Sequence, residues 1–556
     1  MKKLNKHFLL TTVSVKDAWI LSAVVILLVF NPFYLYQKIN LFELGLYLPG
    51  VDSVLKGQIP FRDFFYLRGP MDLYIPAFFM KIFGEHVATL STYFYVGTII
   101  TLLSCVWLAR EVMGSKIFVW ALIPVLVART FPRVVYTFWG GMRFAWGIIA
   151  ILCIVKFIKS KRLSWAVAAG VLTALAILTS VDVGACIAGS IGAVLVLMAM
   201  YEKSQEYIRA LVIVILSCIM VTVPYLVYLH LQGAFFPFID TVWHVVTRLM
   251  HVVTITDPIP SNLQEASLAL FNPKHANFHQ MTPVYCYVAF SIYMIRRVYH
   301  RKLSSVDWAA IAVMLYSFFI YLSCFKNLWG NIFEMALQPE KIILFFLLER
   351  LFFYLKDEKC WTKFAYFIVT AVVISSFIFS IGRLQKRFFS MQWLTRTLSG
   401  KNTDKIMPLA GQSTECLNLE RAKNMTVPQD QANEFIQLEI FLNAHTAISD
   451  PVLMYPELAT LHFIFNRPYI GRFPLVTLTW LKEEWYQEWI GQLQTVAPRY
   501  AVILRDVPDS FKKEMLSTKE NRIKFNAVMN YIKDNYSKIS ETASYDIYQY
   551  VSRHKP

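Results

Sequence analysis

The sequence predicts a membrane bundle of α-helices followed by a soluble C-terminal α/β domain. Of its 556 residues, 56% are hydrophobic and only 16% are charged, a composition too apolar for a protein surrounded by water. The apolar residues gather in runs of roughly 17 to 25, the length that crosses a bilayer. After about residue 387 these runs stop, and strand patterns alternate with helix patterns.

The charge and the cysteines narrow the class of protein. A net charge of +17 would indicate nucleic-acid binding in a soluble protein, but here the Lys and Arg residues form short clusters between apolar runs. That distribution is typical of cytoplasmic loops, so we expect no nucleic-acid partner. Only Cys416 lies in the polar C-terminal region, which therefore can hold no internal disulfide.

We expect eleven membrane spans. They lie near residues 17–36, 88–109, 117–134, 143–158, 163–181, 184–201, 210–230, 283–297, 304–324, 340–355 and 362–382. The basic residues occupy every second connection, as the positive-inside rule requires. This order predicts a protein of the plasma or inner membrane with a cytoplasmic N-terminus. The C-terminal domain then lies outside the cytoplasm, in the periplasm if the cell has one.

The segment 71–84 is apolar but short, and Pro76 interrupts it. A span there would place the later basic clusters outside, so we interpret the segment as an interfacial helix. The first outer loop then covers residues 37–87. The predicted division of the chain is a transmembrane module at 1–386 and an extracytoplasmic α/β domain at 387–556.

Each part of the C-terminal domain has its own pattern. QANEFIQLEIFLNA, WLKEEWYQEWIGQL and the run from Ser510 to Tyr536 predict helices, whereas PVLMY, YAVILRD and YDIYQYV predict short strands. No Walker A loop, dinucleotide-binding glycine pattern or metal-binding Cys/His spacing is present. His244 and its neighbours in the second long loop lack metal spacing, so packing or surface roles are favoured.

Charged residues in the first outer loop are the main candidates for chemistry. Glu43 follows the first span, Asp63 lies in PFRDFF, and Arg68 precedes the interfacial helix. Each has a simpler interpretation. Glu43 can be a solvated carboxylate, Asp63 can pair locally with its neighbouring Arg, and Arg68 can reach lipid headgroups. Arg68 also suits a lipid phosphate, because its guanidinium matches phosphate geometry.

The loop resembles the first outer loop of the GT-C superfamily of membrane glycosyltransferases. A span, an acid just after it, GVDSVLKGQIPFRDFFYLRGP and a short helix ending in FG carry the likeness. The C-terminal stretches VPQDQANEF, YPELATLHFIFNRP and APRYAVI are similar to bacterial family 39-like members. The superfamily includes the lipid A aminoarabinose transferases and the protein O-mannosyltransferases.

The resemblance implies a fold, an activity and roles for particular residues. It implies transfer of a sugar from a polyprenyl-phosphate donor to a saccharide, lipid or protein acceptor outside the cytoplasm, with inversion. Glu43 is then the catalytic base, Asp63 a second acid that binds or orients the acceptor, and Arg68 a residue near the carrier phosphate. Two positions depart from the family pattern, with Arg143 where many members carry Asp and Ser180 where relatives often carry Lys.

This chemistry needs no cofactor, and we expect no divalent metal. A carboxylate can take the acceptor proton, and the phosphate leaving group needs positive charge. Arg68, Arg143, Lys326 and Lys341 can supply it from the predicted outer face, and Arg68 and Arg143 are favoured. Asp182 either lines the cavity or caps the next helix. Glu334 either contacts the acceptor or is solvated in its loop, which is the favoured interpretation.

Two other functions share this composition. A transporter or flippase of a lipid-linked saccharide is disfavoured, because the ionisable residues gather at one membrane face and transporters usually place them at the midplane. A non-catalytic assembly protein is disfavoured only by the acids of the first loop. Glu349, inside the tenth span, is expected to pair with its neighbour Arg350.

Overall fold

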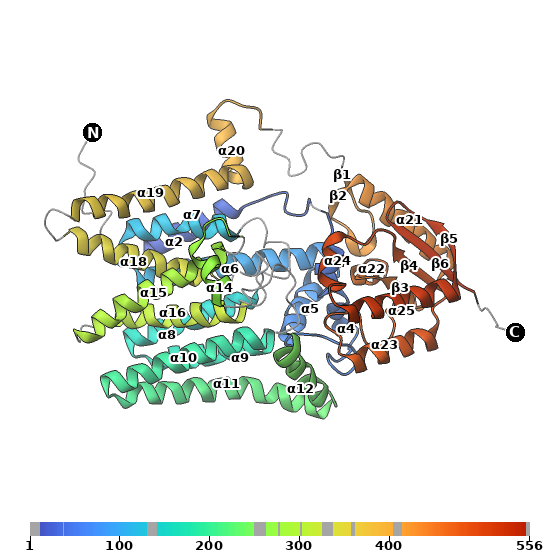
Figure 1. Cartoon of the computed structure of the whole chain (residues 1–556), viewed down its shortest axis with the longest axis horizontal. Coiled ribbons are helices and arrows are strands. Elements are labelled where there is room, and N and C mark those ends of the chain that lie inside the picture. Colours follow the sequence, from blue (N-terminus) through green and yellow to red (C-terminus); the bar gives the residue numbers. More distant parts are fainter. Residues whose placement is uncertain are drawn as a thin grey trace. The chain divides into compact units, whose positions relative to one another are not determined.

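The structure is a computed structural model that describes residues 12–36, 38–130, 142–249, 263–275, 278–300, 303–324, 337–356, 362–403 and 414–551. The chain forms two compact units (Figure 1). The first comprises Met1–Pro32, Phe94–Tyr225 and Ile259–Ile406, and the second comprises Phe33–Tyr93, Leu226–Pro258 and Met407–Pro556.

The described residues of the first unit form helices, most of which are long and apolar. In chain order they are α2 (Val15–Val29), α6 (Val87–Val112), α7 (Lys116–Thr130), α8 (Met142–Ser160), α9 (Leu163–Thr179), α10 (Val181–Glu202), α11 (Gln205–Leu231), α14 (Leu263–Phe271), α15 (Phe278–Tyr299), α16 (Ser305–Cys324), α18 (Gln338–Lys356), α19 (Thr362–Arg387) and α20 (Phe389–Leu398). The first residues of α6 and the last of α11 belong to the second unit. Every predicted span overlaps one of these helices.

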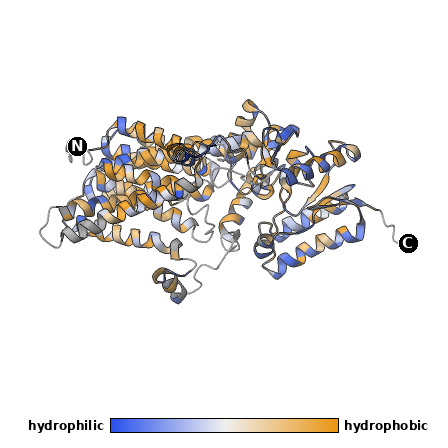
Figure 2. Cartoon of the chain, turned by 90° about the horizontal axis from the view of Figure 1, so that it is seen from above, coloured by the Kyte–Doolittle hydropathy of each residue, from blue (hydrophilic) through white to orange (hydrophobic). Residues whose placement is uncertain are grey.

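Among the described residues, four helices are long and apolar enough to cross a membrane by length and composition: α6, α10, α11 and α16. Shorter apolar helical segments occur at Lys116–Ala128, Leu163–Thr179 and Thr370–Leu384. Hydrophobic residues predominate along the long helices in Figure 2. The helical membrane character is therefore confirmed, and the number of eleven spans stays a prediction.

Small residues and capping side chains let these helices pack closely. A Cβ atom at Gly170 in α9 would lie 2.4 Å from the carbonyl oxygen of Val214 in α11, so glycine permits that close approach. Glu349 is fully buried and accepts hydrogen bonds from the N–H groups of Gly114 and Ser115, just before α7. This carboxylate thus caps the start of another helix. The sequence predicted only a pair with Arg350 and did not predict this contact.

The second unit contains the two long loops and the C-terminal region. The loops form α3 (Leu41–Gly45), α4 (Leu48–Leu55), α5 (Met71–Phe83), α12 (Phe235–His244) and the π-helical turn η1 (Val245–Leu249). The C-terminal region forms β1 (Thr414–Cys416), η2 (Glu420–Ala422), β2 (Thr426–Pro428), α21 (Gln429–His445), β3 (Val452–Tyr455), α22 (Ala459–Ile464), α23 (Glu483–Val496), β4 (Tyr500–Leu504), α24 (Asp509–Met515), α25 (Lys519–Asn535), β5 (Tyr536–Glu541) and β6 (Tyr545–Tyr550).

A mixed sheet organises the C-terminal region. Within the described residues its order is β3-β4-β6-β5, with β3 and β4 parallel and the other neighbours antiparallel. Trp489 of α23 and Ile532 of α25 are buried in one core with Leu453 of β3 and Ile503 of β4. The predicted C-terminal α/β region is confirmed.

A residue of the first outer loop completes that core. Phe65 is 6% exposed and belongs to the same hydrophobic cluster as Trp489. Its ring centroid lies 4.8 Å from that of Trp485 and 5.5 Å from that of Phe473. The loop therefore folds together with the C-terminal domain. The predicted division of the chain, with a membrane module ending at residue 386, stays a prediction.

Candidate functional site

Glu43 lies in the first turn of the short helix α3. The Asn40 side chain caps this helix by accepting a hydrogen bond from the Glu43 N–H at 3.1 Å. Glu43 itself is half-buried, and Leu44 and Gly45 behind it are buried. The cap and the buried residues hold the backbone of the predicted base, and one of its carboxylate oxygens, Oε2, is buried.

Asp63 is held within a tight turn. Its two carboxylate oxygens accept hydrogen bonds from Arg62 Nε and Nη2, at 2.7 and 2.9 Å, and one also accepts from the Ile59 N–H at 2.8 Å. The hydrogen bond from Arg62 keeps the pKa of Asp63 below its usual range. This is the local ion pair weighed in the sequence analysis, and it makes Asp63 a weak proton acceptor.

Arg68 is oriented by two side chains of the same loop. Its Nη1 donates to the Tyr47 hydroxyl at 2.6 Å and lies 3.5 Å from Asp72 Oδ2. The Tyr66 hydroxyl donates to the same Asp72 oxygen at 2.8 Å. Burial and the nearby Asp72 raise the pKa of Tyr66, so it stays protonated and remains a donor.

Asp72 is a residue that the sequence analysis missed. It is only 3% exposed at the start of α5, and it contacts both Arg68 and Tyr66. The only sequence signal is the spacing of four residues between Arg68 and Asp72, which places the two side chains on one face of a helical turn. The loop therefore holds Arg68 through a buried acid as well as an aromatic hydroxyl.

Within the first unit the structure brings together Arg143 and Asp182. Arg143 Nη2 donates to Asp182 Oδ2 at 2.8 Å, and its Nε donates to the Ser180 hydroxyl at 3.0 Å. The Ser180 hydroxyl in turn donates to Asp182. Arg143 is buried, whereas the Asp182 side chain is 31% exposed. Ser180, named only as a departure from the family pattern, is thus the third member of a polar triangle between α8 and α10.

Of the remaining candidate residues, the structure describes some and not others. Lys326 and Glu334 lie outside the described residues. His244 is buried, its Nε2 lies 3.0 Å from the Trp480 carbonyl oxygen and its ring packs edge-on against Trp485, so it has a packing role. Among the residues that the structure describes, no group of three or more His, Cys, Asp or Glu side chains could hold a metal ion.

Comparisons with known proteins place the fold. No protein-family model and no curated protein matches the sequence. The solved structure of ArnT from Cupriavidus metallidurans in the apo state matches with a TM-score of 0.55 and 11% identity, over 97% of this chain and 99% of that one. The chain has the fold of ArnT. The predicted resemblance to GT-C membrane glycosyltransferases is confirmed at the level of the fold.

Two further structures match over most of the chain. ArnT bound to undecaprenyl phosphate gives a TM-score of 0.53 at 10% identity, over 97% of both chains. The oligosaccharyltransferase AglB from Archaeoglobus fulgidus, in complex with an inhibitory peptide and a dolichol-phosphate, gives a TM-score of 0.47 at 11% identity, over 97% of this chain and 74% of that one. Both the ArnT-like fold and the apolar helices indicate an integral membrane protein.

Proposed function

We propose that this protein is an integral membrane glycosyltransferase that transfers a sugar from a polyprenyl-phosphate donor to an acceptor outside the cytoplasm. The observation that carries the proposal is the first loop of an ArnT-like fold, where a half-buried Glu43 and an oriented Arg68 lie on one folded segment. The acceptor is a saccharide, lipid or protein with a free hydroxyl group. The protein would act with eleven spans in the plasma or inner membrane.

The proposed reaction is a direct displacement at the anomeric carbon. The acceptor oxygen forms the new bond to that carbon while the bond to the phosphate oxygen breaks, and Glu43 takes the hydroxyl proton. Polyprenyl phosphate leaves as an anion, and the Arg68 guanidinium stabilises it by charge-assisted hydrogen bonds. Attack opposite the leaving group inverts the anomeric centre. No metal or cofactor enters this scheme.

The other candidates keep narrower roles in the proposal. Asp63 shapes the loop through its contact with Arg62, and its predicted part in orienting the acceptor is a secondary one. Arg143 is proposed to bind phosphate, with Asp182 fixing its orientation. Lys326 and Glu334 remain predicted contacts of donor and acceptor.

The test follows release of polyprenyl phosphate from a labelled lipid-linked sugar by the purified full-length protein. Glu43→Gln removes the proton acceptor and keeps the side-chain shape, so we expect its kcat to fall at least ~100-fold. Asp63→Asn should fall less, because Asp63 is engaged by Arg62. Glu484→Gln, at an exposed position of α23, is the matched control and should retain wild-type kcat.

Two results would contradict the proposal. Undiminished release by Glu43→Gln would remove the base assignment. A wild-type protein that releases no polyprenyl phosphate from any donor, but moves lipid-linked saccharide across a vesicle membrane, would make it a flippase. Adding Mg²⁺, Mn²⁺ or a chelator to the same assay tests metal dependence, and we expect the rate to stay unchanged.

A further inference from the structure

The segment before α3 is bound by one buried amide of the C-terminal domain. Gln431, in α21, is 5% exposed. Its Oε1 accepts a hydrogen bond from the Ile39 N–H at 2.9 Å, and its Nε2 donates to the Ile39 carbonyl at 3.2 Å. Both backbone groups of Ile39 are therefore paired by a side chain that lies 392 residues further along the chain. Such a double contact fixes both the position and the orientation of a peptide segment.

Helix α3 itself rests directly on α22 of the same domain. The hydroxyl of Thr460, which is fully buried, donates to the carbonyl oxygen of Leu41. A Cβ atom at Gly45 would lie 3.0 Å from the Ala459 Cβ atom and 3.1 Å from the Thr460 nitrogen. The contact is therefore tight, and α3 has no room for a side chain at Gly45.

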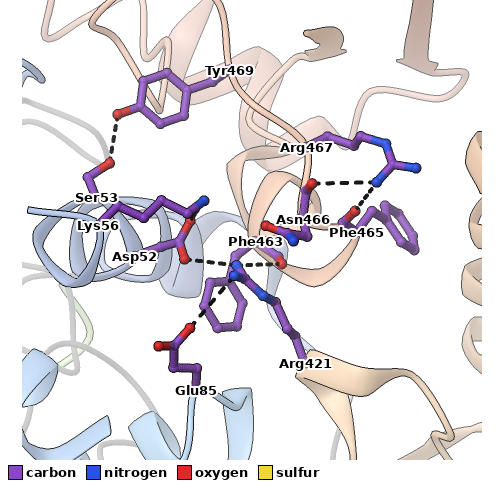
Figure 3. A network of polar contacts seen from close by, with 10 residues as sticks. All are labelled: Asp52, Ser53, Lys56, Glu85, Arg421, Phe463, Phe465, Asn466, Arg467 and Tyr469. Atoms are coloured by element: carbon purple, nitrogen blue, oxygen red, sulfur yellow. Dashed lines mark hydrogen bonds and ion pairs between the residues drawn. The ribbon is translucent and has the colours of Figure 1, made fainter. Parts of the chain in front are cut away.

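The next helix of the loop is bound by a separate polar network (Figure 3). Arg421 Nη1 lies 2.9 Å from Asp52 Oδ1 and 3.4 Å from the Phe463 carbonyl oxygen, and its other nitrogen lies 3.7 Å from Glu85. The hydroxyls of Ser53 and Tyr469 lie 2.9 Å apart. Helix α4 is thus tied to the C-terminal domain at two neighbouring positions, independently of α3.

We infer that Gln431 and Thr460 are positioning residues for Glu43. They bind the backbone of Ile39 and Leu41, which flank Asn40, and Asn40 caps the Glu43 N–H. Neither is required to touch the substrate. A displacement of about 1 Å from the productive geometry can cost a factor of ~100 in rate, so loss of either contact would lower turnover. The inference rests on the proposed function of Glu43.

The experiment compares variants at both ends of the contact. Thr460→Val removes the hydroxyl at nearly constant volume, Thr460→Ser retains it, and Gly45→Ala forces α3 away from α22 without altering the C-terminal core. We expect kcat to fall about 10-fold or more in Thr460→Val, Gln431→Leu and Gly45→Ala. The KM for the lipid-linked donor should change less than about 2-fold, because these variants remove no contact with the bound donor.

Thr460→Ser should recover most of the wild-type kcat, which a role in volume filling alone would not predict. Thr495→Val is the matched control, since the Thr495 hydroxyl bonds to Gly491 within its own exposed helix turn. Amide hydrogen exchange provides a readout besides activity. Exchange at residues 39–46 should rise in the three damaging variants, while the amides of β4 keep their protection.

The outcomes separate this inference from the proposed function. If Glu43→Gln abolishes turnover but Thr460→Val, Gln431→Leu and Gly45→Ala keep wild-type kcat, the positioning role is wrong and the function stands. If Glu43→Gln is fully active, the base assignment fails. If wild type shows no turnover, unchanged exchange at residues 39–46 in all three variants overturns the structural part, and increased exchange supports it.

Discussion

Some partners of the charged side chains could be predicted from the sequence and others could not. Asp63 and Arg62 are adjacent, and Arg68 and Asp72 are four residues apart, so both pairs are local. Their contacts could be predicted from spacing. The partners of Glu349 lie more than 230 residues away, and a backbone N–H has no sequence signature. Long-range capping is therefore the kind of contact that sequence reasoning misses.

A buried histidine gives a pH dependence at this scale. His462 in α22 lines a cavity of about 20 Å³ beside Trp489, and it is 7% exposed. Burial lowers the pKa of His462 from 6.5 to about 4. Between these values the unfolded chain binds a proton that the folded domain excludes, so the stability is complete above about pH 6.5 and falls as the pH drops towards 4.

The size of this loss is at most roughly 3–4 kcal/mol, since one pKa unit corresponds to about 1.4 kcal/mol. We expect His462→Leu to reduce the loss of thermal stability between pH 6.5 and pH 4, measured on the purified protein. His445→Leu, which removes an exposed ring stacked on Phe441, is the control variant. An identical pH dependence in wild type and His462→Leu would contradict the prediction.

The periodicity of apolar residues predicted most helices and strands. Two elements, β5 and α22, were not predicted, the first because it is polar and the second because it is short. Every predicted span overlaps a helix, and PVLMY and YAVILRD contain β3 and β4. Strand β5 was missed because YSKISE carries polar residues, five of which are exposed on a sheet edge. Helix α22 was missed because its six residues are too few for a helical period, although all are buried.

The pair between α8 and α10 predicts an energetic effect at the scale of elements. Asp182→Asn would leave the buried Arg143 guanidinium without its charged partner. Because Asp182 is 31% exposed, solvent offsets part of the loss, and we expect a destabilisation of about 1–2 kcal/mol.

The measurement is thermal unfolding of the full-length protein in one detergent. Asp240→Asn breaks the ion pair with Lys482, where the Asp side chain is 47% exposed, and serves as the control. An exposed pair contributes less than about 1 kcal/mol. Equal shifts in the unfolding temperature for the two variants would contradict the importance of the Arg143–Asp182 contact.

At the scale of the whole molecule, the grouping of the two long loops with the C-terminal region limits how often the chain can cross the membrane between them. The two long loops and the C-terminal region belong to one compact unit. A folded unit outside the bilayer must keep all its parts on one side, so the chain has to cross an even number of times between successive parts. The predicted spans give six crossings between residues 88 and 230 and four between 283 and 382. Both numbers are even, which supports the predicted order.

The segment 71–84 decides whether this order holds. It forms α5, with 13 residues and an internal Pro76, so the helix is about 20 Å long against about 30 Å of hydrocarbon. Asp72 at its start is buried against Tyr66, a residue of the same loop. We therefore expect a tag at Pro556 to be accessible from outside in intact cells, with a tag at Met1 accessible only after permeabilisation. Cytoplasmic accessibility of both tags would mean that α5 crosses the membrane or that another span was miscounted. The C-terminal domain would then lie on the cytoplasmic side, which is the wrong side for the proposed site that it forms with the Glu43 loop.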